Sequence, residues 1–446
     1  MNEKELFEKT PATKLFLKLT IPGMISMVMS SIYWMIDGVL VGHMLGADAF
    51  AALNLVLPIV MISLAVADLI GVGSAVPIAI KLGQHKEAEA SNIFTCACLM
   101  IVSSATVLGA ALFFFAEDLV RLMGAEEHLV QMAAQYLKVY ALTAPVTTIV
   151  FAVDNYLRLC GKVGYSMMTN ILMCVASSAF EFVFLFAFGF GIWAAALANC
   201  IGIFVSVVVA FIPFFRGKTR LRFVRPRPTR RMLVSIVTNG SPAFLSNMAA
   251  RIVSVAMNVV LLRLGGAMAV SAYGVLMYVD GIIEPLLYGM CDSLQPAVGY
   301  NWGRGRRDRV KALELRCFLG CALMAIAETA FLLLCGPFVV RLFVSPMDTA
   351  LTQLSMHALS LFAFAYVTRW IAFATQNYFS AIGAAGRATI ISVSTAFILP
   401  FVLMAALSPL GLNGVWLNLP VTSLLAAMLA LSLLFWKKRA REEVRV

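Results

Sequence analysis

Several ionisable side chains lie inside long apolar stretches, and these residues are the best placed to do chemistry. A charged group at the middle of a bilayer costs at least ~2.5–3.5 kcal/mol, so each one needs a partner or a function. The first half of the chain contains Asp37, Asp68, Asp154 and Glu181, and the second half contains Arg251, Asp280, Glu284, Asp292, Glu328 and Arg369.

The apolar stretches themselves indicate that the solvent around this chain is lipid. Of its 446 residues, 61% are hydrophobic and only 13% are charged, and the mean hydropathy is +0.90. A membrane span needs about 20 apolar residues, and hydrocarbon requires every backbone hydrogen bond to be satisfied internally, as in a helix. We therefore predict an all-α integral membrane protein with twelve transmembrane helices, near residues 15–40, 51–80, 91–115, 129–157, 165–188, 191–215, 233–262, 268–300, 312–336, 355–380, 388–408 and 412–436.

The basic residues give these spans an orientation. Most of the 34 Lys and Arg residues lie before the first span, after the even-numbered spans or at the chain end. The positive-inside rule predicts that this side is cytoplasmic, so we expect a multi-pass protein of the cytoplasmic (inner) membrane with both termini in the cytoplasm. The net charge of +11 then follows from topology and does not indicate nucleic-acid binding. The basic loop Lys218–Arg231 is expected to face anionic lipid headgroups.

An internal repeat with a separation of about 220 residues divides the chain into two halves. The matching pairs include Pro22 with Pro242, Asn155-Tyr156 with Asn377-Tyr378, Leu82-Gly83 with Trp302-Gly303, and Gly191-Ile192-Trp193 with Gly414-Val415-Trp416. We predict an N-terminal six-helix lobe over residues 1–222 and a C-terminal six-helix lobe over residues 223–446. Two pseudo-symmetric lobes in the same orientation suit alternating access around a central cavity.

In the first lobe, three polar side chains are expected at a common depth. With a rise of about 1.5 Å per residue, Asp37, Glu181 and Asn199 lie roughly 8–13 Å below the outer surface. Two carboxyls and an amide at one depth can form a protonation or cation site. The alternative is that a neighbouring hydroxyl or water satisfies each of them separately.

In the second lobe, the charges allow two interpretations. Asp280 and Glu284 lie one helical turn apart on one face of a span. Arg251, Glu328 and Arg369 are expected near the same depth, which allows Arg–carboxylate pairs. A structural ion-pair network and a functional site or substrate cavity remain equally open.

The sequence predicts neither a metal site nor an enzyme. Nine cysteines are present, mostly in apolar runs; Cys317 and Cys321 share a helix face without a His or carboxylate at ligand spacing, so we expect ordinary packing. Nucleotide-binding, metalloprotease and serine-hydrolase motifs are missing from the sequence. Any uphill transport would then be driven by an ion gradient, with no cofactor other than the coupling ion, H⁺ or Na⁺.

Taken together, the motifs resemble those of the multidrug and toxic compound extrusion (MATE) family over essentially the whole chain. The similarity lies in Tyr33-Trp34-Met35-Ile36-Asp37-Gly38, Asp154-Asn155-Tyr156-Leu157-Arg158 and Gln295-Pro296-Ala297-Val298-Gly299-Tyr300-Asn301-Trp302-Gly303. The resemblance implies two lobes around a V-shaped cavity that exchange protons or sodium for amphipathic, often cationic, drugs. It implies a lipid bilayer and small amphipathic substrates as partners, with no obligate protein partner.

The resemblance is greatest to the DinF-like and MepA-like bacterial branch, in which a first-lobe cluster couples ion movement to transport. Asp37 matches the aspartate of that family's first helix. Ser177, Glu181 and Asn199 stand where an asparagine, an aspartate and a threonine are usual. The second-lobe carboxylates of the NorM-like branch are absent from spans seven and ten.

Two other functions remain open at this point. The same superfamily includes flippases for lipid-linked saccharides, whose cationic cavities bind phosphates, and Arg251 and Arg369 are compatible with that role. A membrane-embedded enzyme is the alternative from another class. The substrate is not specified, because a wall rich in Met and Phe suits many ligands.

Overall fold

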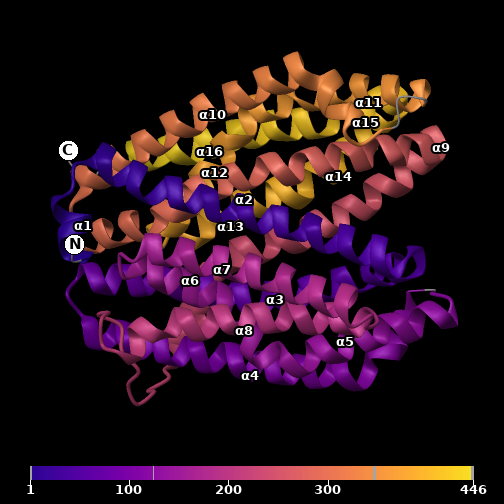
Figure 1. The fold of residues 1–446 in the computed structure, drawn as a ribbon. Helices are drawn as coiled ribbons and strands as arrows, with labels where there is room; N and C mark the ends of the chain where they lie inside the picture. The colour runs from indigo at the N-terminus through magenta and orange to yellow at the C-terminus, as the bar shows by residue number, and fades with distance from the viewer. Residues whose placement is uncertain (1–2, 124, 345–347, 443–446) are drawn as a thin grey trace. The chain divides into compact units, whose positions relative to one another are not determined.

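Helices are the regular elements of this protein over the residues that the structure, a computed structural model, describes: 3–123, 125–344 and 348–442 (Figure 1). The first half contains α1 (Glu3–Lys9), α2 (Ala12–Leu45), α3 (Ala47–Gly83), α4 (Glu87–Leu122), α5 (Glu127–Thr147), α6 (Val150–Leu159), α7 (Val163–Phe182), the π-helix η1 (Val183–Ala187) and α8 (Ile192–Phe215). The second half contains α9 (Arg230–Gly303), α10 (Arg307–Arg341), α11 (Thr349–Phe362), α12 (Phe364–Ala381), α13 (Ala385–Val393), the π-helix η2 (Ser394–Ile398), α14 (Leu399–Leu407), the 3₁₀-helix η3 (Ser408–Leu410), α15 (Gly411–Trp416) and α16 (Asn418–Glu442).

The number of membrane spans depends on how the bent pair α11 and α12 and the long helix α9 are counted. In the described residues, ten helices are long and apolar enough to cross a membrane, and α11 with α12, bent by 42°, forms one more. Helix α9 has 74 residues, and at about 1.5 Å per residue it is several times longer than a ~30 Å bilayer core. Its backbone breaks at Gly266, where φ is 63°, between the predicted spans 233–262 and 268–300. Counting α9 as two spans gives the twelve predicted.

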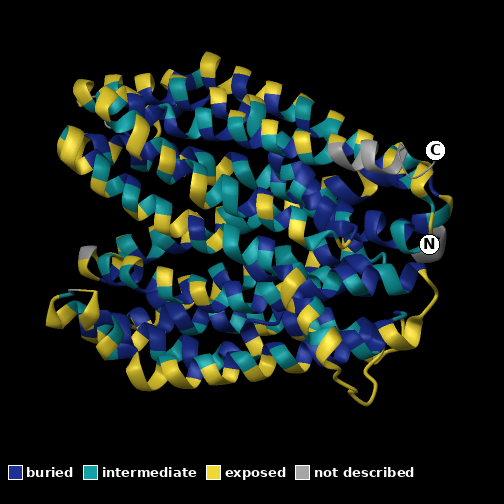
Figure 2. Ribbon diagram, turned by 180° about the vertical axis from the view of Figure 1, so that it is seen from behind, coloured by how far each residue is buried: buried dark blue, intermediate teal, exposed yellow. Residues whose placement is uncertain are grey.

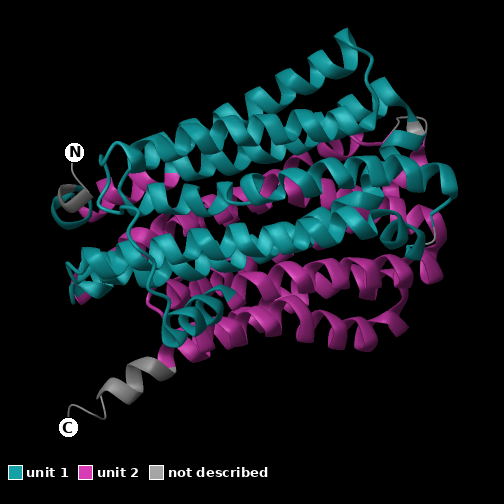
Figure 3. Ribbon diagram, turned by 90° about the horizontal axis from the view of Figure 1, so that it is seen from below, with its two compact units in different colours: residues 1–10, 21–240, 299–306 teal, residues 11–20, 241–298, 307–446 magenta. Residues whose placement is uncertain are grey.

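By contacts, the chain divides into two compact units, coloured separately in Figure 3. Unit 1 contains residues 1–10, 21–240 and 299–306, and unit 2 contains residues 11–20, 241–298 and 307–446. In unit 1, α4 packs against α3 and α5, and α7 packs against α8; in unit 2, α12 packs against α10 and α16. The division of the sequence repeat at residues 222 and 223 stays a prediction. The predicted cytoplasmic position of the chain ends concerns residues 1–2 and 443–446, which lie outside the described residues.

Within unit 1, the two copies of one repeated motif contact each other reciprocally. A Cβ atom on Gly83 of α3 would lie 2.1 Å from the carbonyl oxygen of Tyr300 on α9. A Cβ atom on Gly303 of α9 would lie 2.2 Å from the carbonyl oxygen of Ile80 on α3. Both distances are far below van der Waals contact, so only glycine permits the two backbones to approach this closely.

Burial is distributed as expected for a protein in lipid. Exposed residues recur along the helices and not only at their ends (Figure 2). Large apolar side chains are among them, such as Phe114 at 77% and Leu334 at 81% exposure. Exposure of this apolar surface to water would cost free energy, whereas contact with hydrocarbon does not. Each unit also has its own apolar core, one around Leu53 and Val120 and the other around Leu276 and Phe362.

Candidate functional site

Two buried carboxyls lie close together in unit 1. Asp37 on α2 is 1% exposed and Glu181 on α7 is 0% exposed. The two groups are near enough for each to act electrostatically on the other. In the part of the chain that the structure describes, both oxygens of Glu181 and Oδ1 of Asp37 have no hydrogen-bond partner. Two carboxyls buried side by side are costly to ionise together, because each has lost its hydration and each repels the other.

A close contact between α7 and α8 positions the remaining members of the predicted cluster. A Cβ on Gly202 would lie 2.1 Å from Ser177 Oγ and 2.5 Å from its backbone nitrogen, so a larger residue would force the helices apart. At this contact the Ser177 hydroxyl donates to the Asn199 carbonyl oxygen at 3.4 Å. Ser177 and Glu181 are four residues apart and therefore share one face of α7. The structure thus brings Asn199 and Ser177 together, one turn from Glu181.

The helix that carries Glu181 changes its winding directly after this residue. Helix α7 ends at Phe182 and continues as the π-helix η1 over Val183–Ala187. A π-helical turn inserts an extra residue and rotates the side chains beyond it about the helix axis, and such turns are frequent at functional sites.

The Asn199 side-chain oxygen on α8 is also buried, and it has no hydrogen-bond partner among the described residues.

Two tyrosines complete the surroundings of the acid pair, and neither was predicted from the sequence. Tyr33 on α2 and Tyr136 on α5 are both buried. Their hydroxyls are near enough to Asp37 and Glu181 for electrostatic interaction. Tyr33 lies one helical turn before Asp37, a spacing that the sequence does contain. No spacing in the sequence links Tyr136 to Asp37, because their approach depends on how α2 and α5, which are far apart in the sequence, are placed in the fold.

In unit 2, a second cluster consists of ion pairs. The Arg369 guanidinium donates to Asp280 Oδ1 at 2.7 Å and also to Glu284. The Tyr366 hydroxyl donates to the same Asp280 oxygen at 2.7 Å. Arg369 therefore holds two carboxylates that lie one turn apart on α9, an arrangement typical of a structural network.

The two other predicted members of this cluster are placed differently. Glu328 on α10 lines the same small pocket as Glu284 and Arg369, but its Oε1 has no hydrogen-bond partner among the described residues. Arg251 is exposed, and its charge acts on Glu284 without an ion pair in the described chain. Direct pairing of Arg251 with a carboxylate, which the sequence allowed, is not found there.

A third charged group near a helix end is locally satisfied. Arg158 binds Asp154 at 2.6 Å, four residues earlier on α6, as the spacing of these residues suggested. Asn170 donates to Asp154 at 2.9 Å. This pair stabilises unit 1 without an unsatisfied charge and is not a candidate coupling site.

The fold and the buried acids together define a multi-pass helical membrane protein with ionisable groups inside its spans. The sequence profile of the family described as MatE matches residues 22–183 and 242–405, which is most of the chain, and the two segments begin 220 residues apart. The chain therefore belongs to the MatE family, the MATE transporters. This confirms the resemblance of the motifs, and membership of a transporter family excludes the alternative of a membrane-embedded enzyme.

Curated relatives and solved structures agree with this assignment. The chain is 24% identical over 443 residues to the multidrug export protein MepA of Staphylococcus aureus (strain NCTC 8325 / PS 47), covering 98% of this chain and 96% of MepA. It is 22% identical to MepA of Staphylococcus saprophyticus over 441 residues, with the same coverage.

Among solved structures, the fold matches an "outward-facing conformation of a multidrug resistance MATE family transporter of the MOP superfamily". The TM-score is 0.93 at 22% identity, with 100% of this chain and 99% of the other covered. A MOP superfamily transporter from Pyrococcus furiosus, described as having a binding pocket of reverse polarity that suggests a different function, matches with a TM-score of 0.92 at 22% identity and the same coverage. The predicted all-α membrane fold is thereby confirmed over the full length.

Proposed function

We propose that this MATE transporter is an antiporter that uses a proton or sodium gradient to export amphipathic, often cationic, drugs or toxic metabolites from the cytoplasm. Two lobes over residues 1–222 and 223–446 would alternate the access of the substrate between the two sides of the cytoplasmic membrane, with both termini in the cytoplasm. Support for the substrate class comes from the MepA relatives, which are named as multidrug export proteins.

We place the ion-coupling site at Asp37 and Glu181, with Ser177 and Asn199 beside them. The observation that supports this most directly is the burial of two adjacent carboxyls whose oxygens largely lack hydrogen-bond partners among the described residues. Two such groups cannot both be ionised cheaply, because each has lost hydration and each repels the other. A proton or a sodium ion held between them removes both costs.

Release of that ion toward the cytoplasm would provide the driving force for export. A membrane potential of 100 mV supplies about 2.3 kcal/mol for each elementary charge that crosses the membrane. That is enough for a concentration gradient of roughly 50-fold in a neutral substrate, at 1.4 kcal/mol for each factor of ten. The drug and the ion need not touch, provided that each favours a different state of the transporter.

The experiment is transport by the full-length chain in proteoliposomes, with a pH gradient and a sodium gradient imposed separately. Efflux of a lipophilic fluorescent cation that follows one gradient and stops when that gradient is collapsed would identify the coupling ion. Transport that continues without either gradient but requires ATP would contradict the proposal.

A flippase for lipid-linked saccharides is less well supported by the charges of unit 2. A lipid diphosphate would need accessible cations, but Arg369 is already bound by Asp280 and Glu284. Arg251 is exposed and free of such pairs in the described chain, so it is one cation that a phosphate could reach without displacing a carboxylate. Movement of a labelled lipid diphosphate across vesicles without drug transport would favour this second function.

A further inference from the structure

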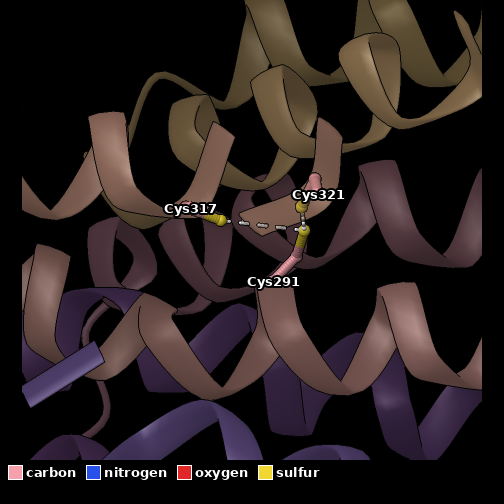
Figure 4. Close-up of side chains that lie close together, drawn as sticks. All are labelled: Cys291, Cys317 and Cys321. Atoms are coloured by element: carbon pink, nitrogen blue, oxygen red, sulfur yellow. Dashed lines mark hydrogen bonds between the residues drawn. The ribbon is translucent and has the colours of Figure 1, made fainter. Parts of the chain in front are cut away.

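Three cysteines from two helices bring their sulfur atoms together inside unit 2. Cys291 comes from α9, whereas Cys317 and Cys321 lie one turn apart on α10 (Figure 4). The Sγ atom of Cys291 lies 4.0 Å from that of Cys317 and 3.6 Å from that of Cys321, and all three sulfurs lie within 4.8 Å of one another. The sequence predicted ordinary packing for Cys317 and Cys321, for want of a His or carboxylate at ligand spacing. The approach of Cys291, which lies on another span, has no signal in the sequence.

The spacing of these sulfurs matches that of ligands around one metal ion. An ion bound to thiolates at about 2.3 Å in a trigonal plane holds its three sulfurs about 4.0 Å apart. The distances of 4.0 and 3.6 Å therefore require only small side-chain movements to surround an ion. They are much longer than the ~2.05 Å of a disulfide bond, and all three cysteines are free.

A fourth soft donor lies beside the three thiols. The Sδ atom of Met290 is 3.6 Å from the Sγ of Cys321. Thiolates and thioethers select soft cations, whereas Mg²⁺ and Ca²⁺ require oxygen ligands. Of the three cysteines, the most exposed is Cys317 at 7%, so the cluster is shielded from water and from competing ligands.

Two carboxyl side chains also lie near the cluster. The Glu328 side chain is near enough to act electrostatically on Cys321. Glu314 lines a small pocket together with Cys291 and Cys317, and a second pocket reaches Cys321 beside Glu328. The two small pockets therefore border the cluster, one beside Cys291 and Cys317 and the other beside Cys321.

We propose that Cys291, Cys317 and Cys321, with Met290 as an additional thioether donor, form a binding site for a soft monovalent cation of the Cu(I) or Ag(I) type. The thioether beside the cysteines favours a soft monovalent ion, because Met sulfur suits Cu(I) and not hard divalent cations. Cysteine binds a metal as thiolate, so each cysteine that binds Cu(I) gives up its proton, which passes to solvent.

The test uses the purified full-length chain in detergent, under argon with a phosphine reductant. Cu(I) is supplied from its bicinchoninate complex, unbound metal is removed by gel filtration, and retained copper and released protons are both counted. We expect one Cu(I) per chain, one proton released for each cysteine that binds, up to about three, and a sulfur-only shell at about 2.3 Å in X-ray absorption. Wild-type protein that retains no Cu(I) would overturn the proposal, and so would preferential retention of Zn(II) or Cd(II).

Cysteine variants distinguish copper binding at this cluster from copper binding at the other six cysteines of the chain. Cys291→Ser should weaken Cu(I) binding by more than the roughly 10–100-fold that loss of an outer-shell partner costs. The matched control Cys98→Ser removes a buried cysteine of α4 and should leave the stoichiometry unchanged. If Cys291→Ser retains as much copper as Cys98→Ser, the cluster is not the site.

A second variant tests the proposal if Cys291→Ser folds poorly. A variant that retains only Cys291, Cys317 and Cys321, with the other six cysteines replaced by Ser, should still bind one Cu(I). Cu(I) should also raise the melting temperature of this variant, because a ligand that binds the folded state stabilises it. A folded three-cysteine variant that binds no copper would contradict the proposal. Neither readout requires transport, so the result is independent of the proposed antiport.

Discussion

Gly202 of α8 lies directly against Ser177 of α7, closer than any residue with a side chain could. This contact sets the distance between the helix that carries Glu181 and the helix that carries Asn199. The polar cluster in unit 1 is therefore as dependent on a glycine as on its acids.

Replacing this glycine should separate the two helices. In Gly202→Ala the added methyl would lie 2.1 Å from Ser177 Oγ, and overpacking of this kind costs about 1–3 kcal/mol. Thermal unfolding in detergent should show the loss, and coupled export should fall with it. Gly164→Ala, in the partner helix α7, adds a methyl that meets nothing within 4 Å and is the matched control. Equal melting temperatures for the two variants would disprove the tight contact.

The acid pair should behave as one titrating unit. In Asp37→Asn a neutral amide imitates the protonated carboxyl, so we expect coupled efflux to be lost while drug binding persists. Glu181→Gln should act similarly, and the double variant should be little worse than either single one, because groups that share one site are not additive. Proton release on drug binding measures the effect. Normal pumping and normal proton release by Asp37→Asn would place the coupling site elsewhere, and Glu284 would be the next residue to test.

Loss of the Tyr33 hydroxyl beside the acid pair should change the affinity for the coupling ion more than the stability of the fold. Tyr33 OH has no hydrogen-bond partner among the described residues, so Tyr33→Phe should leave stability unchanged. If this hydroxyl contacts the bound ion, its loss should weaken apparent ion affinity by roughly 0.5–1.5 kcal/mol, or about 2–12-fold. Tyr140→Phe removes another buried hydroxyl without a partner among those residues and serves as the control. The ion dependence of efflux distinguishes the two variants, and identical curves would remove Tyr33 from the site.

The ion pairs of unit 2 predict opposite outcomes for two arginines. Arg369→Met leaves Asp280 and Glu284 without their cation, and stranding a buried charge costs about 3–5 kcal/mol. Because the Arg369 and Asp280 side chains remain 21% and 13% exposed, we expect the lower end of that range, about 3 kcal/mol. Arg251→Met should be nearly neutral, since this exposed residue has no ion pair in the described chain. Comparable melting temperatures for the two variants would show that the network does not stabilise the fold.

Hydropathy predicted the helices well because apolar runs of this length satisfy their backbone in lipid only as helices, being too long for the strands of a barrel. The depth estimate also placed Asp37 and Glu181 near one another, since depth depends only on position along a span. What the sequence lacked was the rotation of each helix about its axis. That rotation brings Tyr136 to the acids and Cys291 to Cys317, whereas it leaves Arg251 exposed.

The reciprocal contact of Gly83 and Gly303 has a consequence for the symmetry of the packing between α3 and α9. Residues 80 and 300 occupy corresponding repeat positions, as do residues 83 and 303, so the pairs Gly83–Tyr300 and Gly303–Ile80 are the same contact made twice. In an isologous interface residue i contacts j and j contacts i, which is the pattern of a two-fold symmetric dimer. At this point the packing of α3 against α9 is therefore locally two-fold symmetric, and one repeat position, glycine in both copies, is constrained by the same contact twice. A side chain at either position would break one half of the pair and leave the other half intact.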